Sequence, residues 1–386
     1  MQSSLDTILL KVASRCNINC SYCYVFNMGD DNWTHLQKKI STATVDAFCR
    51  SIERLLRTQE SIFSIVLHGG EPLLIGIKGL TYLLSSLRAF LPASYPISIQ
   101  TNGILLTTEI LDICSFYRTT VAVSIDGPKE VHDRWRTDHV GNGSFDRALA
   151  GIRLLQGHSD NAFLNTGLLA VIDPCSDPGE VYDFFKELKA QSVDFIFRDG
   201  NHDRLPLGKS SLDSLEYGRW MGGLLDVYLS DPDPVPVRIL DDMMKVLLGG
   251  MVSKEGVGVT DFGILIVDTD GSIMKNDTLK SSFNGADKFG LAANIRDICL
   301  VDFIRSTEFI SYRGSQRPSC TACRNCPEIG VCGGGMMLHR WSVQNGFGNP
   351  SVYCADQLYL IGKMRRMVSK LICDHDRSKL PGLLPS

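Results

Sequence analysis

Three cysteines lie on one short stretch near the start of the chain, Cys16-Asn-Ile-Asn-Cys20-Ser-Tyr-Cys23. Three thiolates on one loop can bind three irons of a [4Fe–4S] cube and leave the fourth iron open, whereas a cluster held by four cysteines is closed. An open iron can chelate the amino and carboxylate groups of a small molecule and pass an electron to it. A structural zinc site is the alternative, but it normally needs a fourth Cys or His nearby, and none occurs before His35.

Three further segments, each at the end of a predicted strand, carry residues suited to hold such a molecule. The motif His68-Gly69-Gly70-Glu71-Pro72 has paired glycines that allow close backbone approach, and Glu71 offers an acceptor to an ammonium group. Asn102 ends the next strand, and Ser124 and Asp126 end the one after it. Arg136 can either pair with a carboxylate through two hydrogen bonds or form a surface ion pair. Barrel enzymes place their sites at these strand ends.

Together these segments resemble the radical SAM superfamily, whose members cleave S-adenosylmethionine reductively to make a 5′-deoxyadenosyl radical. The resemblance implies that Cys16, Cys20 and Cys23 bind a [4Fe–4S] cluster and that an external reductant such as flavodoxin or ferredoxin supplies the electron. It also implies a set of residues that bind S-adenosylmethionine: Tyr22, Gly69, Gly70, Glu71, Asn102, Ser124, Asp126 and Arg136.

The elements that must position these residues alternate between short β-rich runs and amphipathic helical stretches, which indicates parallel strands with crossover helices. The predicted strands are Thr7–Ala13, Phe63–Leu67, Ile97–Gln100, Val121–Ser124, Asn165–Val171 and Asp194–Phe197. The predicted helices are Ser41–Thr58, Ile77–Phe90, Thr107–Tyr117, Phe145–Gln156 and Pro178–Gln191. With the resemblance, this order implies an α/β fold: a partial (βα)6 TIM-type barrel followed by a cysteine-rich extension.

The pattern changes at the proline-rich run Ser230–Val237, where we expect a domain junction. Three regions are predicted: a barrel over residues 1–232, a bridging region over 233–290, and an auxiliary-cluster domain over 291–386. The bridging region should contain a hairpin of Phe262–Val267 and Gly271–Met274, turned at Asp270-Gly271. A last helix is expected at about Ala355–Cys373.

A second group of cysteines lies near the end of the chain: Cys320, Cys323, Cys326, Cys332 and Cys354. Their surroundings resemble the C-terminal SPASM or shorter twitch extension of radical SAM enzymes that modify peptides, in which full domains hold two auxiliary clusters. The resemblance implies one auxiliary [4Fe–4S] cluster held by Cys323, Cys326, Cys332 and Cys354. Cys320 either replaces one of these ligands or is an inert neighbour. A zinc knuckle is the structural alternative for the whole group.

Two departures from the SPASM pattern remove ligands from the other auxiliary cluster. Met336 stands where the pattern has the fourth cysteine of its core spacing, and Asn276 stands where it has an upstream cysteine. We therefore expect the second auxiliary cluster to be absent. Asp277, which follows Asn276, matches the aspartate that acts as a base in the related sulfatase maturases. Its alternative role is that of an ordinary loop aspartate after a hairpin.

The chain most resembles the SPASM/twitch maturases that form three-residue cyclophanes in ribosomally synthesised peptides. The resemblance implies a precursor peptide as substrate and a bond between an aromatic ring carbon and the β-carbon of a nearby residue. Alternatives are oxidation of Ser or Cys to formylglycine, thioether or epimerase chemistry, and, outside enzymes, an iron–sulfur redox sensor or electron carrier. No separate peptide-binding domain is expected before the first strand, so the leader should bind in the groove between barrel and extension, through a partner, or along an edge strand.

Composition limits the binding partners and the cellular compartment to be expected for the protein. The net charge of −4 gives no basic footprint for nucleic acid. No apolar run approaches the roughly 18 residues typical of a membrane span, and the first residues lack the features of a secretion signal, so we expect a cytoplasmic protein. In a reducing compartment clustered cysteines are more often ligands than disulfides. The five scattered ones should be small buried hydrophobic residues: Cys49, Cys114, Cys175, Cys299 and Cys373.

Overall fold

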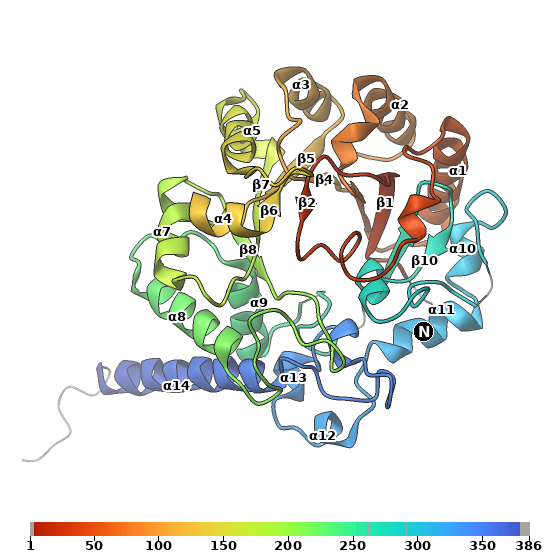
Figure 1. Ribbon diagram of the computed structural model, residues 1–386. Coiled ribbons are helices and arrows are strands. Elements are labelled where there is room, and N and C mark those ends of the chain that lie inside the picture. Colours follow the sequence, from red (N-terminus) through yellow and green to blue (C-terminus); the bar gives the residue numbers. More distant parts are fainter. Residues whose placement is uncertain (1–3, 253, 261, 291, 379–386) are drawn as a thin grey trace, which may run out of the picture.

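An eight-stranded sheet runs through the protein in the order β10-β9-β1-β3-β4-β5-β7-β8 (Figure 1). This computed structural model describes residues 4–252, 254–260, 262–290 and 292–378, with side chains as far as residue 370. All neighbouring strands are parallel except β9 and β10. The strands are β1 Thr7–Ala13, β3 Ser64–Gly69, β4 Ile97–Thr101, β5 Thr119–Ser124, β7 Asn165–Val171, β8 Val193–Ile196, β9 Ile264–Val267 and β10 Ile273–Met274.

Helices form an outer ring around this sheet (Figure 1). The main ones are α1 Thr42–Thr58, α2 Ile77–Arg88, α3 Thr108–Phe116, α5 Phe145–Gly157, α7 Pro178–Glu187, α8 Glu216–Ser230 and α9 Arg238–Leu247. Shorter elements lie in the connections between the strands and the helices: β2 Asn19–Cys20, η1 Asn32–Thr34, η2 Pro72–Ile75, α4 Lys129–Trp135, β6 Arg136–Thr137 and α6 Asn161–Leu164. Side-chain caps set several helix starts; the Ser41 hydroxyl, for example, accepts a hydrogen bond from the amide of Thr44.

The predicted partial barrel is confirmed. Each predicted strand and each of the five predicted helices has a counterpart, and Thr7–Ala13 and Asn165–Val171 have the predicted bounds. These strands read as nearly continuous apolar runs because both of their faces are covered, as is usual for parallel sheets. The two edge strands, β8 and β10, do not pair with each other in the described part of the chain, so the barrel is open between them.

The bridging region contributes strands to the barrel sheet itself. The predicted hairpin is confirmed as β9 and β10, and β9 pairs in parallel with β1 from Thr7 opposite Ile264 onwards. The proline-rich run also lies along the sheet, because the amide of Val193 donates to the carbonyl of Pro236 at 2.8 Å. The sheet therefore continues across the boundary predicted at residue 232. The division of the chain into three domains stays a prediction.

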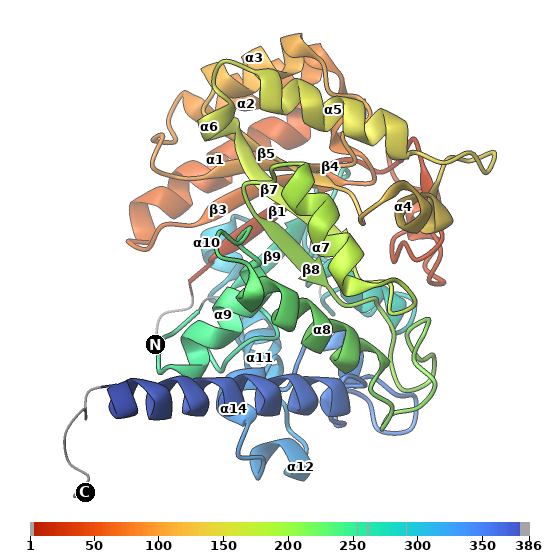
Figure 2. The ribbon, with the colours of Figure 1, turned by 90° about the vertical axis from the view of Figure 1, so that its left-hand side faces the viewer.

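The extension lies across the open side of the barrel (Figures 1 and 2). Its elements are η3 Asp277–Ser281, α10 Leu300–Phe303, α11 Thr307–Ser315, α12 Thr321–Arg324, α13 Ile329–Cys332, η4 Leu338–Arg340 and α14 Cys354–Ser378. Helix α14 packs along α8, where Lys363 donates to the carbonyl of Gly222 at 2.7 Å. No helix in the described part of the chain combines the length and the apolar content that a membrane crossing requires.

One prediction about the scattered cysteines is wrong. Cys49 and Cys114 are buried as expected, and Cys299 is partly buried, but Cys175 is exposed. Cys175 lies in the turn between β7 and α7, where its amide donates to the Asp173 carboxylate, and connections of this kind run over the surface. The side chain of Cys373 lies outside the described residues.

Candidate active site

The first three cysteines lie on the loop that follows β1, next to the loop that follows β3. The amides of Gly70 and Glu71 donate to the carbonyls of Ala13 and Arg15, both at 2.9 Å. A Cβ on Gly69 would lie 2.0 Å from the Ala13 oxygen, and one on Gly70 would lie 2.3 Å from the Arg15 oxygen. The two glycines are therefore required by the contact between the two loops, whatever they bind in addition.

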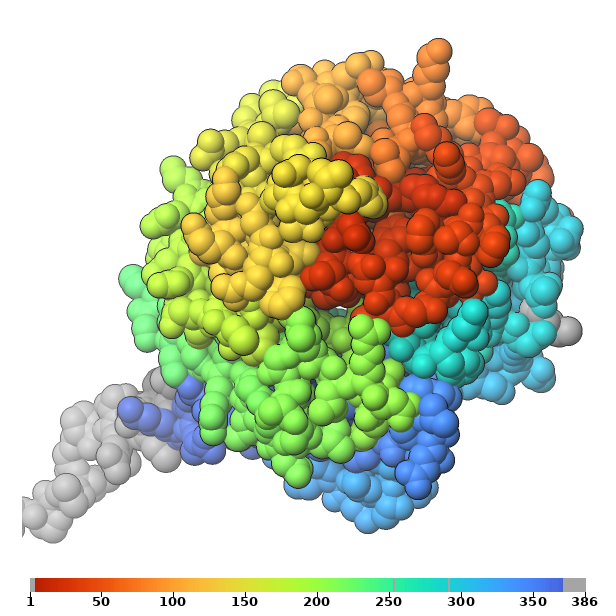
Figure 3. Space-filling view, viewed as in Figure 1, coloured from red at the N-terminus to blue at the C-terminus, as the bar shows by residue number. Residues whose placement is uncertain are grey.

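A single cavity of about 250 Å³ lies between the cysteine loop and the strand ends. All of the predicted site residues from the barrel line it, except Asp126: Cys16, Cys20, Tyr22, Cys23, Gly69, Gly70, Glu71, Asn102, Ser124 and Arg136. Thr278 and Met336, which follow the barrel in sequence, line it as well. Over this face the first loop, the segment near residue 140 and the segment near residue 200 meet at the surface (Figure 3).

The three thiols of this cavity are partly or fully shielded from solvent. Burial raises the pKa of Cys16 to about 12 and that of Cys23 to about 11, and it also raises the pKa of Cys20. Without a metal centre these thiols are protonated, and a bound cluster would have to displace the protons. The nearby Arg136 acts in the opposite direction on Cys20 and favours its thiolate. This donor set suits the three-thiolate site predicted from the sequence.

The described residues contain no group of three or more His, Cys, Asp or Glu side chains close enough together to hold a single metal ion. A four-iron cube is larger than one ion and holds its thiolates farther apart. The assignment of Cys16, Cys20 and Cys23 as cluster ligands therefore stays a prediction. It is supported by their spacing and by the cavity that they share.

Arg136 forms a buried network with two other predicted site residues. It donates to the Tyr22 hydroxyl at 2.8 Å and approaches the Asp126 carboxylate at 3.4 Å, while the Tyr22 hydroxyl donates to Asp126 at 2.6 Å. The surface ion pair considered for Arg136 is wrong, because the side chain is buried between the cysteine loop and β5. Its Nε is buried and has no hydrogen-bond partner among the described residues.

Asp126 does not line the cavity, contrary to the prediction that it contacts the cofactor. Its second oxygen accepts from the amide of Val171 at 3.1 Å, so the carboxylate is enclosed by protein donors. It is 2% exposed and lies behind Tyr22 and Arg136 as seen from the cavity. Its position suits an orienting role, in which it fixes the two residues that do line the cavity.

Glu71, Asn102 and Ser124 are fixed by hydrogen bonds at the ends of β3, β4 and β5. The Glu71 carboxylate accepts from the Thr101 hydroxyl at 2.7 Å and from the Asn102 amide at 2.9 Å, and burial raises its pKa. The Asn102 side chain contacts the Cys16 sulfur at 3.8 Å. Ser124 accepts from Gln100 at 2.9 Å. Much of the hydrogen-bonding capacity of Glu71 is thus used within the protein.

Asp277, the predicted base, is held by two lysines. Lys11 contacts its carboxylate at 2.6 Å and Lys280 at 3.3 Å, and the side chain is 1% exposed. Although burial opposes ionisation, the two ammonium groups hold the pKa of Asp277 well below its usual range. A carboxylate with a low pKa is a weak proton acceptor, and Asp277 does not itself line the cavity. Its role as a base stays a prediction, and the ion pairs weigh against it.

Several residues of the cavity were not predicted from the sequence: Tyr24, His68, Phe197, Arg198 and Asp199. Tyr24 lies between the cavity and Asp277, whose charge helps raise the pKa of the tyrosine. Arg198 and Asp199 follow β8, the sixth barrel strand. Barrel sites lie at the carboxyl ends of strands. The same rule that predicts site residues after the first four strands points to Arg198 and Asp199 after the sixth.

The second group of cysteines lies around α12, α13 and the start of α14. Burial and the neighbouring thiols Cys320, Cys332 and Cys354 together raise the pKa of Cys323 to about 12. Burial raises the pKa of Cys332, and the nearby thiols Cys326 and Cys354 add to this effect. The donor set suits a four-cysteine cluster. Cys320 lies beside Cys323, so both roles considered for it remain open.

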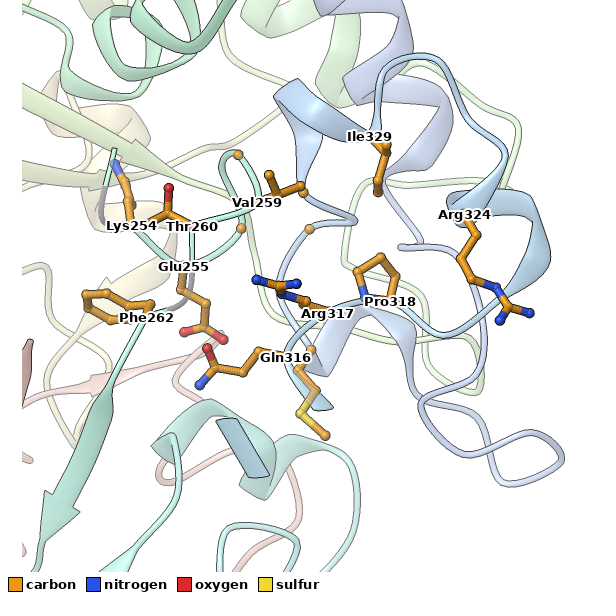
Figure 4. Close-up of a pocket in the computed structure, with 15 residues that line it drawn as sticks. Lys254, Glu255, Val259, Thr260, Phe262, Gln316, Arg317, Pro318, Arg324 and Ile329 are labelled. Atoms are coloured by element: carbon orange, nitrogen blue, oxygen red, sulfur yellow. The ribbon is translucent and has the colours of Figure 1, made fainter. Parts of the chain in front are cut away.

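The Glu255 carboxylate and the Asn276 amide occupy the region in which a second auxiliary cluster would need cysteine ligands. Asn276 donates to Glu255, and the backbone of Met336 packs against Gly256. A cavity of about 200 Å³ opens beside them, where Figure 4 shows the Glu255 carboxylate and the Gln316 amide on facing segments. No cysteine is among the residues that line this cavity. These residues do not fit a second auxiliary cluster, which supports its predicted absence.

Comparison with known proteins finds similarity to radical SAM enzymes. The model of the radical SAM superfamily matches residues 10–174. A cysteine-type anaerobic sulfatase-maturating enzyme of Clostridium perfringens is 25% identical over 358 residues, which cover 91% of this chain and 93% of that protein. The radical SAM cyclopropyl synthase TigE of Paramaledivibacter caminithermalis is 22% identical, over 89% of this chain and 70% of that protein. The structure of anSMEcpe with bound AdoMet has the same fold, with a TM-score of 0.79 at 21% identity, over 95% of this chain and 98% of that chain.

Proposed function

Because the chain is a radical SAM enzyme, we propose that it oxidises a side chain of a peptide or protein substrate with the loss of two hydrogens. The observation that carries this proposal is the composition of the main cavity. Residues of the cysteine loop and of five barrel strand ends line it together with Thr278 and Met336 of the later segments. A substrate bound there would lie between the cluster loop and the extension.

S-adenosylmethionine and the [4Fe–4S] cluster, when bound, supply a radical that removes a hydrogen atom from an unactivated carbon. In the proposed arrangement Cys16, Cys20 and Cys23 hold the cluster. Arg136 lines the cavity and would bind the carboxylate of the cofactor there, and Tyr22 and Asp126 orient it.

Of the specific reactions that fit this proposal, the relatives favour oxidation of a cysteine or serine to formylglycine. The sulfatase-maturating enzyme of Clostridium perfringens matches this chain over nearly its whole length. The likeness extends through the extension as well as the barrel. This reaction is our first candidate.

A crosslink between an aromatic ring carbon and a β-carbon is the second candidate. It is favoured by the second-cluster region, where Asn276 and Met336 stand at positions that carry cysteines in the SPASM pattern, and where Asn276 donates to Glu255. Sulfatase maturases usually carry the full set of cysteines. The similarity to TigE, named as a cyclopropyl synthase, adds a relative that makes carbon–carbon bonds. The substrate of either reaction would be a peptide, such as a ribosomally made precursor.

The test is anaerobic incubation of the reconstituted protein with S-adenosylmethionine, dithionite and two synthetic peptides. One peptide carries the cysteine of a sulfatase-type sequence. The other carries an aromatic residue two positions before a residue whose β-carbon bears a hydrogen. Formation of 5′-deoxyadenosine together with an aldehyde that reacts with hydroxylamine supports formylglycine. A loss of two hydrogens that blocks fragmentation between the two residues supports the crosslink. If no 5′-deoxyadenosine forms with any reductant, the result would instead favour a redox sensor.

A further inference from the structure

Asp199 differs from the other carboxylates of the site in having no partner among the residues that the structure describes. It follows β8, lines the main cavity and is partly buried. Glu71, Asp126 and Asp277 each accept hydrogen bonds from buried protein donors. The described residues offer the Asp199 carboxylate neither a hydrogen bond nor an ion pair. Its oxygens are therefore available to whatever occupies the cavity.

The groups around Asp199 come from several elements. Glu255 lies on the loop of residues 254–260, Asp277 lies on η3, and both act on it as like charges. Tyr24 of the cysteine loop and Tyr353 before α14 lie near enough for the charge of Asp199 to act on them, although the Tyr353 hydroxyl donates to the carbonyl of Arg198. Arg198, its neighbour in sequence, is directed elsewhere, towards Asp173 and the ring of Trp135. No lysine or arginine is among the groups that lower the pKa of Asp199.

This environment prepares Asp199 to exchange a proton near neutral pH. Burial, with the charges of Glu255 and Asp277 as smaller causes, raises its pKa to about 7. A general base works best when its pKa lies near the working pH, because both protonation states are then accessible. Asp277 has the opposite environment, since Lys11 and Lys280 keep it ionised. Two carboxylates in such different surroundings are suited to different roles.

We propose that Asp199 is a catalytic residue whose carboxylate contacts the peptide and takes the proton that the peptide loses during oxidation. This inference rests on the proposed function. For a cysteine substrate, the Cβ–H bond breaks and its hydrogen atom leaves to the cofactor-derived radical. The S–H proton goes to Asp199, one electron goes to an iron–sulfur cluster, and a C=S double bond forms. For a crosslink, the proton instead leaves the aromatic ring carbon as the C–C bond forms.

The substitution Asp199→Asn tests the proton transfer, with Asp203→Asn as the matched control. Asp203 lies four residues later and accepts from the amide of Val343 outside the main cavity. With the two peptides named above, D199N should form 5′-deoxyadenosine within about twofold of the parent enzyme. Its ratio of product to 5′-deoxyadenosine should fall about a hundredfold, as expected for loss of a general base. In the parent enzyme, product formation should rise as the pH increases through about 7, because Asp199 ionises there. In D199N this rise should be absent.

A second measurement needs no substrate and no turnover. Because the folded protein keeps the Asp199 proton up to about pH 7 and the unfolded chain releases it near pH 4, the parent enzyme loses stability as the pH rises through this window. D199N does not titrate there, so its melting temperature should exceed that of the parent holoenzyme by more at pH 8 than at pH 5.5. D203N is measured at the same two pH values for comparison.

The outcomes separate this inference from the proposed function. If the parent enzyme modifies a peptide and D199N does so with an unchanged product ratio, Asp199 is not the base, although the proposed function stands. An equal fall in 5′-deoxyadenosine and product, with weaker peptide binding by fluorescence anisotropy, would assign Asp199 to peptide positioning alone and overturn the base role. If the parent enzyme modifies neither peptide, the proposed function fails first.

Discussion

The two glycines after β3 are the residues whose replacement has the most direct physical consequence. A side chain on Gly70 would meet the backbone of the cysteine loop, which cannot move without displacing Cys16. Gly69 adds a φ of 138°, a conformation that side-chain-bearing residues rarely adopt. These positions are thus constrained by the fold of the cluster loop, in addition to any contact with a cofactor.

We predict that Gly70→Ala displaces the cysteine loop. The clash should cost about 1–3 kcal/mol of stability, and the iron content after reconstitution should fall because the three thiols no longer share one cavity. Iron and sulfide assays and a chemical unfolding curve measure the two effects. Gly157→Ala is the control, since no atom would lie within 4 Å of its new Cβ. Equal iron content in G70A and G157A would contradict the prediction.

At the scale of elements, a buried cluster of charges joins the first strand to the extension. Lys11 lies on β1 and contacts Asp277 of η3, and Lys280 of η3 contacts Asp287 at 3.5 Å. Both lysines also approach Asp268, which follows β9. Two ammonium groups and three carboxylates are thereby enclosed with little access to water. Buried charges are tolerated when they are paired in this way.

We predict that Lys11→Met lowers the free energy of unfolding by about 3–5 kcal/mol, because it leaves Asp268 and Asp277 less compensated in the interior. Lys129→Met, which breaks the exposed pair with Asp146, should change it by less than about 1 kcal/mol. Denaturant titration of both variants under identical conditions gives the comparison. Similar losses in the two variants would show that burial does not strengthen the Lys11 pairs.

At the scale of the whole molecule, the extension covers the open side of the barrel and brings the second thiol group with it (Figure 2). Tyr353, next to Cys354, donates to the carbonyl of Arg198 at 2.6 Å, which ties the start of α14 to the end of β8. The Val352 amide donates to the carbonyl of His339 within the extension. The main cavity is therefore completed only when barrel and extension are packed together.

We predict that the protein binds two [4Fe–4S] clusters and no more. Cys326→Ala should reduce the iron and sulfide content to that of one cluster, because it removes a ligand of the auxiliary site. Cys175→Ala, which removes an exposed thiol outside both groups, should leave the content unchanged. Iron and sulfide assays with electron paramagnetic resonance of the reduced protein make the measurement. A third cluster in the parent protein would show that the Glu255 and Asn276 region binds metal after all.

The sequence by itself determined the features that depend on neighbours along the chain. Strand runs, helix caps and the short spacing of Cys16, Cys20 and Cys23 are local, and so was the match of the GGEP segment to the end of a strand. With the family resemblance, these features predicted the partial barrel and most of the cavity. They also predicted the departures at Asn276 and Met336.

The tertiary structure alone decided which charges meet. Nothing near Asp277 in the sequence indicates its contact with Lys11, which lies 266 positions away and forms a buried ion pair with it. Nor does any local pattern show that Asp126 lies behind Arg136, or that Asp199 lacks a partner. A carboxylate acquires its pKa from burial and from the charges around it, and these are set by segments that only folding brings together.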